Sequence, residues 1–300
     1  MSKKIFALHG MLFAYIIFFA TAKKTDSKCT FMFEIEKIII APQWEQQLSA
    51  AGLLDIEALT TREFEWFEEP NYRLGGTSAV TRLCLTQEAP ETEQVALFLK
   101  TEKNHGYRTI ENGMRKRLCY EREMDAFEGL KDTGVLPELL LFAKWRRGKD
   151  VGSFVITRAL DGFVGLEEWI TDVRQTNSNP NENIRQMMAS VAEASRVMHA
   201  TGWAHFSFEP QHVFVGPEHA GKYSIRFIDF ERARRPYRSK VFVTEDLSRL
   251  LRKSDRFLSR EQKMQFLLDY FQTESFSPKQ FKWVDEVEQR GSLKSTVADS

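Results

Sequence analysis

The first half of the chain is marked by short apolar runs that are bounded by turn residues. Runs of about four to eight residues are typical of strands buried in a sheet. Val95–Lys100 shows this most clearly, because an unbroken apolar run ends in a single lysine. Gly75–Gly76 separate two extended segments within Tyr72–Leu85, and Pro90 marks a polar turn over 88–93. Further strands are predicted over 139–144 and 152–157.

The second half has the helical period instead, with apolar residues three or four positions apart. In the predicted helix Ile184–Ala200 the inward positions are Met187, Met188, Val191, Ala194 and Val197. A comparable helix, Leu118–Lys131, lies in the first half, after two shorter ones over 42–54 and 56–66. Other helices are predicted over 166–174, 246–257, 260–271 and 277–289, and a hairpin over 205–228.

Strands followed by helices are typical of an α+β protein. We expect two lobes, a small β-rich N-lobe over 32–158 and a helical C-lobe over 159–290, with the ligand cleft between them. The basic, polar stretch Asn104–Arg117 is predicted to be a loop. The end of the chain, 291–300, is predicted to be a disordered tail.

Residues 1–31 form a separate apolar segment with three interpretations. Lys3–Lys4 precede the apolar run Ile5–Ala22, which is at the short end of the range for a membrane anchor. The basic start, the apolar middle and Ala20-Thr21-Ala22 also fit a cleaved secretory signal. In the third interpretation, translation begins at Met32, where domain-like sequence starts.

Composition and charge narrow the class of protein. Hydrophobic residues make up 42% of the chain and charged residues 28%, as in ordinary soluble globular proteins. The 42 basic residues balance 42 acidic ones, so there is no net field to attract nucleic acid, and no nucleic-acid partner is expected. Cys29, Cys84 and Cys119 have no metal-ligand spacing, which is consistent with a reducing compartment.

The stretch from Trp203 to Val215, followed by Asp229, carries the most informative motif. It resembles the catalytic loop of protein kinases, His-Arg-Asp-x-x-x-x-Asn, and the Asp-Phe-Gly turn that follows it. His205 stands at the position of the His, which supports the loop backbone, and Asp229 at that of the metal-binding Asp. Ser207 replaces the catalytic Asp, and His212 replaces the Asn that holds a second metal ion. For His212, a hydrogen-bonding role and metal ligation both stay open, because imidazole suits softer metals than Mg²⁺.

Phosphoryl transfer depends on positioning and charge neutralisation, and the chain offers the required groups in kinase order. Gly75 and Gly76 are candidates for a phosphate-binding turn, because glycine lets the backbone approach a ligand closely. Lys100 ends a buried strand, as the phosphate-binding lysine of kinases does. Glu123, on the next helix, is its expected partner, and Glu121 is a rival for that role.

Two further acidic residues extend the motif. Asp246 resembles the buried kinase aspartate that hydrogen-bonds the catalytic loop, although an Asp near a helix N-terminus is also favoured by the helix dipole. Glu209 or Asp229 is a candidate to accept the substrate proton in the absence of a catalytic Asp, because both lie close to the loop. The basic segments 103–108 and 115–117 are candidates to receive an anionic glycan or a membrane surface, or are solvated loops.

Taken together, these pieces resemble the lipopolysaccharide kinase family (Kdo/WaaP group), and most of all its InaA-type branch. The resemblance extends from about Glu65 to Leu251 and rests on an ordered set rather than on any single motif. Its carriers are Phe67–Arg73 with Gly75–Gly76, Leu97–Lys100, Arg122–Glu123, Gly202–His205, His212–Val215 and Phe227–Arg235.

The resemblance implies a two-lobed protein-kinase-like fold and phosphorylation of a lipopolysaccharide core sugar (Kdo or heptose) or another anionic glycan, with ATP and Mg²⁺. In that case Lys100 would bind the ATP phosphates, Glu123 would hold Lys100, and Asp229 would bind Mg²⁺. Ser207 departs from the kinase pattern but is consistent with the InaA-type branch. It leaves open a catalytically weak or inactive pseudokinase that binds nucleotide and regulates a partner, and also another small-molecule phosphotransferase. The expected location is cytoplasmic, including contact with the inner face of the cytoplasmic membrane.

Overall fold

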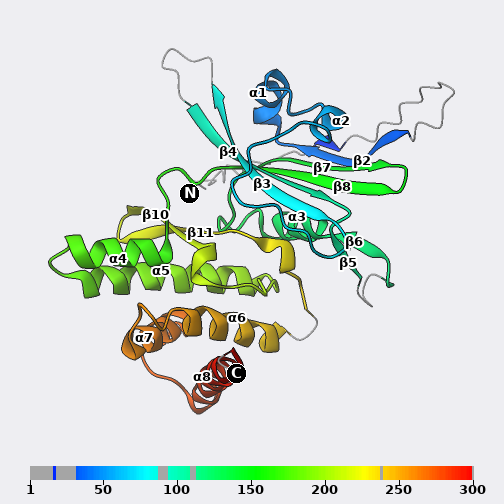
Figure 1. The fold of residues 1–300 in the computed structure, drawn as a ribbon. Coiled ribbons are helices and arrows are strands. Elements are labelled where there is room, and N and C mark those ends of the chain that lie inside the picture. The colour runs from blue at the N-terminus through cyan, green and yellow to red at the C-terminus, as the bar shows by residue number, and fades with distance from the viewer. Residues whose placement is uncertain (1–15, 18–31, 87–93, 109–112, 237–238, 299–300) are drawn as a thin grey trace, which may run out of the picture.

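A computed structural model describes residues 16–17, 32–86, 94–108, 113–236 and 239–298. It confirms the expected α+β architecture. Figure 1 shows a lobe built on a sheet, with the helices α4 to α8 of a second lobe beneath it. A small sheet, in the order β11-β10-β9, lies on the side of the helical lobe that faces the larger sheet.

The N-lobe sheet is antiparallel, with strand order β1-β2-β7-β8-β4-β3. Its strands are β1 Ile16–Ile17, β2 Phe33–Ile40, β3 Thr77–Thr86, β4 Gln94–Lys103, β7 Leu139–Arg147 and β8 Asp150–Arg158. Strand β4 contains the apolar run Val95–Lys100 and lies inside the sheet, where it pairs with β3 and β8. The sequence missed β2, and the predicted turn over 88–93 lies outside the described residues.

Helices cover both faces of this sheet. On one face are η1 Pro42–Trp44, α1 Glu45–Ala50 and α2 Ile56–Leu59, and on the other is α3 Cys119–Leu130. Because successive side chains of a strand point to opposite faces, Leu141 and Ala143 of β7 pack in the cluster with α1 and α2. Phe142, between them, packs with Met124 of α3.

Two expectations about this lobe were wrong. The helix predicted over 56–66 ends at Leu59, because the following residues pair with β3 instead: Phe67 donates its N–H to Val80 O, and Asn71 pairs with Ser78. The stretch 104–117, predicted to be loop, contains the paired strands β5 Gly106–Arg108 and β6 Lys116–Leu118. In both places backbone pairing with a neighbouring segment of the chain outweighs the pattern within the segment itself.

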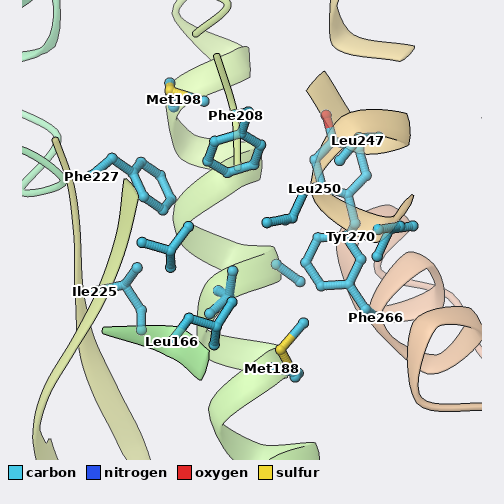
Figure 2. Packing of buried hydrophobic residues seen from close by; sticks show 14 of the residues in the cluster. Leu166, Met188, Met198, Phe208, Ile225, Phe227, Leu247, Leu250, Phe266 and Tyr270 are labelled. Carbon is cyan, nitrogen blue, oxygen red and sulfur yellow. The ribbon is translucent and has the colours of Figure 1, made fainter. Parts of the chain in front are cut away.

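The C-lobe is built around the long helix α5 (Figure 2). Its buried face includes Met198, and side chains from other elements pack in the same cluster, among them Phe208, Phe227, Leu250 and Phe266. The elements are β9 Val164–Gly165, α4 Leu166–Thr176, α5 Pro180–Ala200, η2 Pro210–His212, β10 Val213–His219, β11 Lys222–Phe227, η3 Phe230–Arg232, α6 Ser239–Lys253, α7 Arg260–Phe271 and α8 Pro278–Ala298.

The C-terminal end differs from the prediction, and most of the N-terminal segment lies outside the described residues. Helix α8 continues to Ala298, whereas a disordered tail was predicted from 291. Gly291 is the one strong helix breaker in that stretch, and a single glycine costs a helix only about 1 kcal/mol. Of the N-terminal apolar segment the structure describes only β1, which pairs with β2. Among the described residues no helix has the length and apolarity needed to cross a membrane.

Candidate functional site

The loop from Ala204 to His212 is held to the C-lobe by a buried carboxylate. Asp246 of α6 accepts the backbone N–H of His205 at 2.6 Å and that of Phe206 at 2.8 Å. These bonds fix Phe206 at a φ of 63°, a conformation that is uncommon for a residue other than glycine. His199 Nε2 lies 3.3 Å from the same carboxylate. Asp246 therefore lies where the kinase motif predicts the aspartate that supports the loop.

His205 ties this loop to the strand that precedes Asp229. Its Nε2 lies 2.9 Å from Ile228 O, and its Nδ1 lies 3.3 Å from the backbone N of Ser207. Nε2 therefore donates and Nδ1 accepts, which requires the neutral ring. Complete burial lowers the pKa of His205 to about 4, against the opposing effect of Asp246, so the ring is neutral at physiological pH.

His212 and Asp229 come together at the end of the same loop. His212 Nδ1 lies 2.6 Å from Ser207 O, and Nε2 lies 3.3 Å from Asp229 Oδ2. When the ring is neutral, Nδ1 donates its proton to Ser207 O and Nε2 is an acceptor, 3.2 Å from the Gln211 amide nitrogen and beside the Asp229 carboxylate. The backbone of Asp229 is left-handed, with a φ of 66°. The structure thus places the side chains of the two predicted metal ligands in contact with each other.

Lys100 and Glu123 form a buried ion pair between the sheet and α3. Lys100 Nζ lies 2.6 Å from Glu123 Oε1, and the two side chains are 17% and 2% exposed. Burial by itself lowers the pKa of Lys100, but the Glu123 and Asp229 carboxylates outweigh it and raise the pKa, so the lysine is charged. The rival, Glu121, is engaged elsewhere: it accepts from Lys144 Nζ and from the backbone N of Leu118.

Glu231 belongs to the same charge cluster, and the sequence analysis missed it. Burial, together with the negative charges of Asp229 and Glu123, raises the pKa of Glu231 to about 7, although Lys100 opposes the shift. Glu231 occupies the third position of the Asp-Phe-Gly motif, where kinases have glycine. This acidic residue in place of the motif glycine was the sequence signal that could have identified Glu231 as a site residue. Lys100, Glu123, Asp229 and Glu231 therefore share one electrostatic environment.

The glycine turn joins the extended segment 65–71 to β3. A Cβ on Gly76 would lie 2.1 Å from the backbone carbon of Asn104, so only glycine fits there. Gly75 has a φ of 73°. Lys116 Nζ donates to Leu74 O at 3.1 Å and to Asn104 O at 2.5 Å, which fastens the turn to the end of β4.

The two candidate proton acceptors, Glu209 and Asp229, have different surroundings, while Ser207, at the position of the catalytic Asp, is buried. Glu209 Oε1 lies 3.3 Å from Arg249 Nη1 of α6, so its carboxylate is held in an ion pair. The structure therefore ties Glu209 to the C-lobe helix and leaves Asp229 with the cluster around Lys100.

A cavity of about 600 Å³ lies away from this cluster and is lined in part by residues 158–161, at the end of β8 and directly after it. Its walls include Phe127, Leu136, Leu160, Phe163 and Arg226. None of Lys100, Glu123 and Asp229 lines it, so it is not the expected nucleotide cleft.

Comparisons with known proteins identify the family and agree with the fold. Residues 57–270 match the family model described as "Lipopolysaccharide kinase (Kdo/WaaP) family". Protein InaA of Escherichia coli (strain K12) is 26% identical over 196 residues, which cover 63% of this chain and 82% of InaA. The solved structure "WaaP in complex with acyl carrier protein" superposes with a TM-score of 0.57 at 20% identity, covering 85% of this chain and 98% of that one.

Proposed function

The chain belongs to the lipopolysaccharide kinase (Kdo/WaaP) family, and we propose that it is an ATP-dependent kinase that phosphorylates a sugar, Kdo or heptose, of the lipopolysaccharide core. The observation that carries the proposal is the buried Lys100–Glu123 ion pair at 2.6 Å, held in the field of Asp229. Burying a lysine is costly unless it is paired. A pair that also faces a second carboxylate is suited to receiving a phosphate chain with its metal ion.

In this proposal the nucleotide is bound from two sides. Lys100, kept charged by Glu123, neutralises phosphate oxygens, while the backbone N–H groups of the glycine turn approach them from the N-lobe. Lys116 supports that turn by bonding Leu74 O and Asn104 O. The absence of a Cβ at Gly76 is needed for this packing.

A divalent cation fits the donor set at the end of the catalytic loop. Asp229 would supply a carboxylate and His212 its Nε2, which lies 3.3 Å from that carboxylate. Burial, together with the negative charges of Asp229 and Glu123, raises the pKa of the neighbouring Glu231 to about 7. An Mg²⁺ ion held by Asp229 and His212 would supply positive charge that offsets the charge of the phosphates. The residues of this chain orient it: Ser207 O holds the imidazole through Nδ1. Since imidazole prefers softer ions, we propose tolerance of Mn²⁺ as well as Mg²⁺.

The acceptor hydroxyl has no aspartate to take its proton at the usual place. A general base typically contributes about 10²- to 10⁴-fold, so its loss slows phosphoryl transfer without abolishing the electrostatic contribution. Asp229 is the candidate base that remains beside Lys100, because Glu209 is paired with Arg249. We therefore propose a slow kinase, working mainly by charge neutralisation and positioning.

The alternative is a pseudokinase that binds nucleotide and regulates a partner. Ser207 in place of the base favours it. Both proposals place the protein in the cytoplasm, where ATP is available. Contact with the inner membrane surface through the basic stretch has less support, because three of its charges have partners within the lobe. These are Lys103 with Asp150, Arg117 with Asp125, and Lys116 with backbone carbonyls.

Thermal unfolding with and without ATP and Mg²⁺ tests nucleotide binding. Ligand well above its Kd is expected to stabilise the parent by about 1 kcal/mol or more. Lys100→Ala and Asp229→Ala are expected to lose the shift, whereas Lys103→Ala, which removes a surface lysine of the same strand, keeps it. No shift in the parent would contradict both proposals. With binding established, phosphate transfer to core oligosaccharide distinguishes a kinase from a pseudokinase.

A further inference from the structure

The end of β4 presents a buried carboxylate to the start of α3. Glu102 is 1% exposed. Its Oε1 accepts the backbone N–H of Tyr120 at 2.9 Å and the Ser153 hydroxyl at 2.5 Å, and its Oε2 accepts the backbone N–H of Cys119 at 3.0 Å. The carboxylate thus receives two of the N–H groups that a helix leaves unpaired at its N-terminus. Oε2 has one bond and a second lone pair to offer.

His105, close to Glu102, is buried, and no hydrogen bond within the described part of the chain explains its burial. It is 2% exposed, yet neither ring nitrogen has a hydrogen-bond partner among the described residues. Leaving a buried polar group without a partner costs about 1–3 kcal/mol. Its Nδ1 lies 3.7 Å from Glu102 Oε2, which is too long for a hydrogen bond. The helix cap explains Glu102, but it does not explain a buried histidine beside it.

Cys119, the first residue of α3, completes a set of three. The ligand-type atoms of Glu102, His105 and Cys119 all lie within 4.8 Å of one another, and all three residues are buried. We propose that these residues form a binding site for a zinc-like divalent metal ion at the joint between β4 and α3. This site is separate from the proposed cation site at Asp229, and it does not depend on whether the chain transfers phosphate.

The spacing supports a shared ion. Two ligand atoms that are each about 2.0–2.3 Å from a tetrahedral zinc ion are roughly 3.3–3.8 Å apart. The 3.7 Å between His105 Nδ1 and Glu102 Oε2 falls in that range. A small movement of the side chains would bring the Cys119 sulfur to the same distance, because the whole set is within 4.8 Å. Three protein ligands leave a fourth position for water.

The ligand types select the class of metal. Thiolate and imidazole favour zinc and other late transition metals, whereas Mg²⁺ and Ca²⁺ require oxygen ligands. The expected ion is therefore zinc or a chemically similar metal, and the carboxylate completes a mixed sulfur, nitrogen and oxygen set. Sequence spacing could not reveal this site, because Cys119 comes from a different element than Glu102 and His105.

Such an ion would act on the position of α3. Glu102 and Lys100 are on the same strand, while Cys119 and Glu123 are on the same helix, one turn apart. A metal that joins Glu102 to Cys119 would fasten the helix to the strand beside the Lys100–Glu123 pair. The role is structural: it holds the helix that supplies Glu123, and it does not contact the reacting atoms.

The test uses the purified full chain. Elemental analysis after dialysis is expected to give about one zinc per chain. After removal of the metal with a chelator, added Co²⁺ is expected to produce a thiolate-to-cobalt charge-transfer band, because Cys119 is a ligand. Cys119→Ser and His105→Gln are expected to lose or shift this band. Cys84→Ser, which alters an exposed cysteine, keeps it.

Hydrogen exchange of the parent provides a readout that does not depend on the folding of a variant. Zinc is expected to slow exchange in the first turn of α3 by about tenfold or more, since metal binding and local folding are coupled. If Co²⁺ gives no thiolate band and zinc leaves this exchange unchanged, the proposal is overturned. A band that survives Cys119→Ser would place the ion elsewhere and overturn it too.

Discussion

His212 Nε2 lies 3.3 Å from Asp229 Oδ2, and the other nitrogen of the same ring is bonded to Ser207 O. The backbone oxygen of residue 207 therefore orients the histidine that stands in for the asparagine, and this contact does not depend on the side chain at position 207. The replacement keeps a polar group beside Asp229, the proposed metal ligand, but changes that group from a hard oxygen to a softer nitrogen.

This contact predicts a change in metal preference. His212→Asn would restore an oxygen ligand, so we expect the Mg²⁺ affinity of the ATP complex to rise relative to that for Mn²⁺. Calorimetric titration of both ions with the parent and the variant measures the ratio. His219→Asn, at an exposed histidine of β10, is the matched control and should leave the ratio unchanged. An unaltered ratio in His212→Asn would show that the imidazole is not a ligand.

Loss of Glu123 should destabilise the fold strongly. Glu123→Ala would leave the Lys100 charge largely buried without its partner, which typically costs about 3–5 kcal/mol. Glu128, on the same helix, makes an exposed ion pair with Lys37, and Glu128→Ala is expected to cost less than about 1 kcal/mol. Urea unfolding measures both free energies. Similar values for the two variants would contradict the view that Lys100–Glu123 is a buried pair.

Stability should depend on pH through His205. The pKa of the folded state, about 4, is below the value of 6.5 in an unfolded chain, because burial disfavours the charged ring. The unfolded state therefore binds more protons between these values. The contribution of His205 to the free energy of unfolding is fully present above pH 6.5. It is lost as the pH falls towards 4, by up to about 3 kcal/mol.

Glu231 changes the stability in the opposite sense. Because burial raises its pKa to about 7, its contribution to the free energy of unfolding is lost as the pH rises through that value. The informative measurement is therefore the difference between the parent and His205→Asn in urea unfolding from pH 7.5 to pH 4.5. We expect a shallower loss of stability on acidification in the variant. His219→Asn serves as control, and parallel curves for the parent and His205→Asn would refute the assignment.

Ser207→Asp tests whether the site is a weakened kinase. An aspartate at this position would supply the missing base, so we expect kcat for phosphate transfer to rise by about 10²-fold or more with little change in nucleotide affinity. Steady-state turnover and ATP titration check the two quantities separately. Ser207→Asn, of similar size but without a basic carboxylate, should not gain rate. If Ser207→Asp folds, binds ATP and still transfers nothing, the pseudokinase alternative is favoured.

Much of the fold was predictable because it depends on local patterns. The apolar run that ends at Lys100, the helical period of α5 and the Gly75–Gly76 turn are each encoded within a short stretch. The resemblance to the Kdo/WaaP family is confirmed, since the family match covers residues 57–270. Segment boundaries were less predictable: the helix over 56–66 ends early, because residues 67 and 71 pair with β3, beyond the glycine turn.

The sequence by itself determined the division into a strand-rich and a helix-rich half, the family, and the residue types available for phosphate and metal binding. Only the tertiary structure decided which of these groups meet. It assigned Glu123 rather than Glu121 to Lys100, paired Glu209 with Arg249, and added Glu231 to the charge cluster. It also joined Glu102, His105 and Cys119. The physical reason is that ion pairing and burial act between atoms close in space, and several of these partners are on different elements that only the folded lobes bring together.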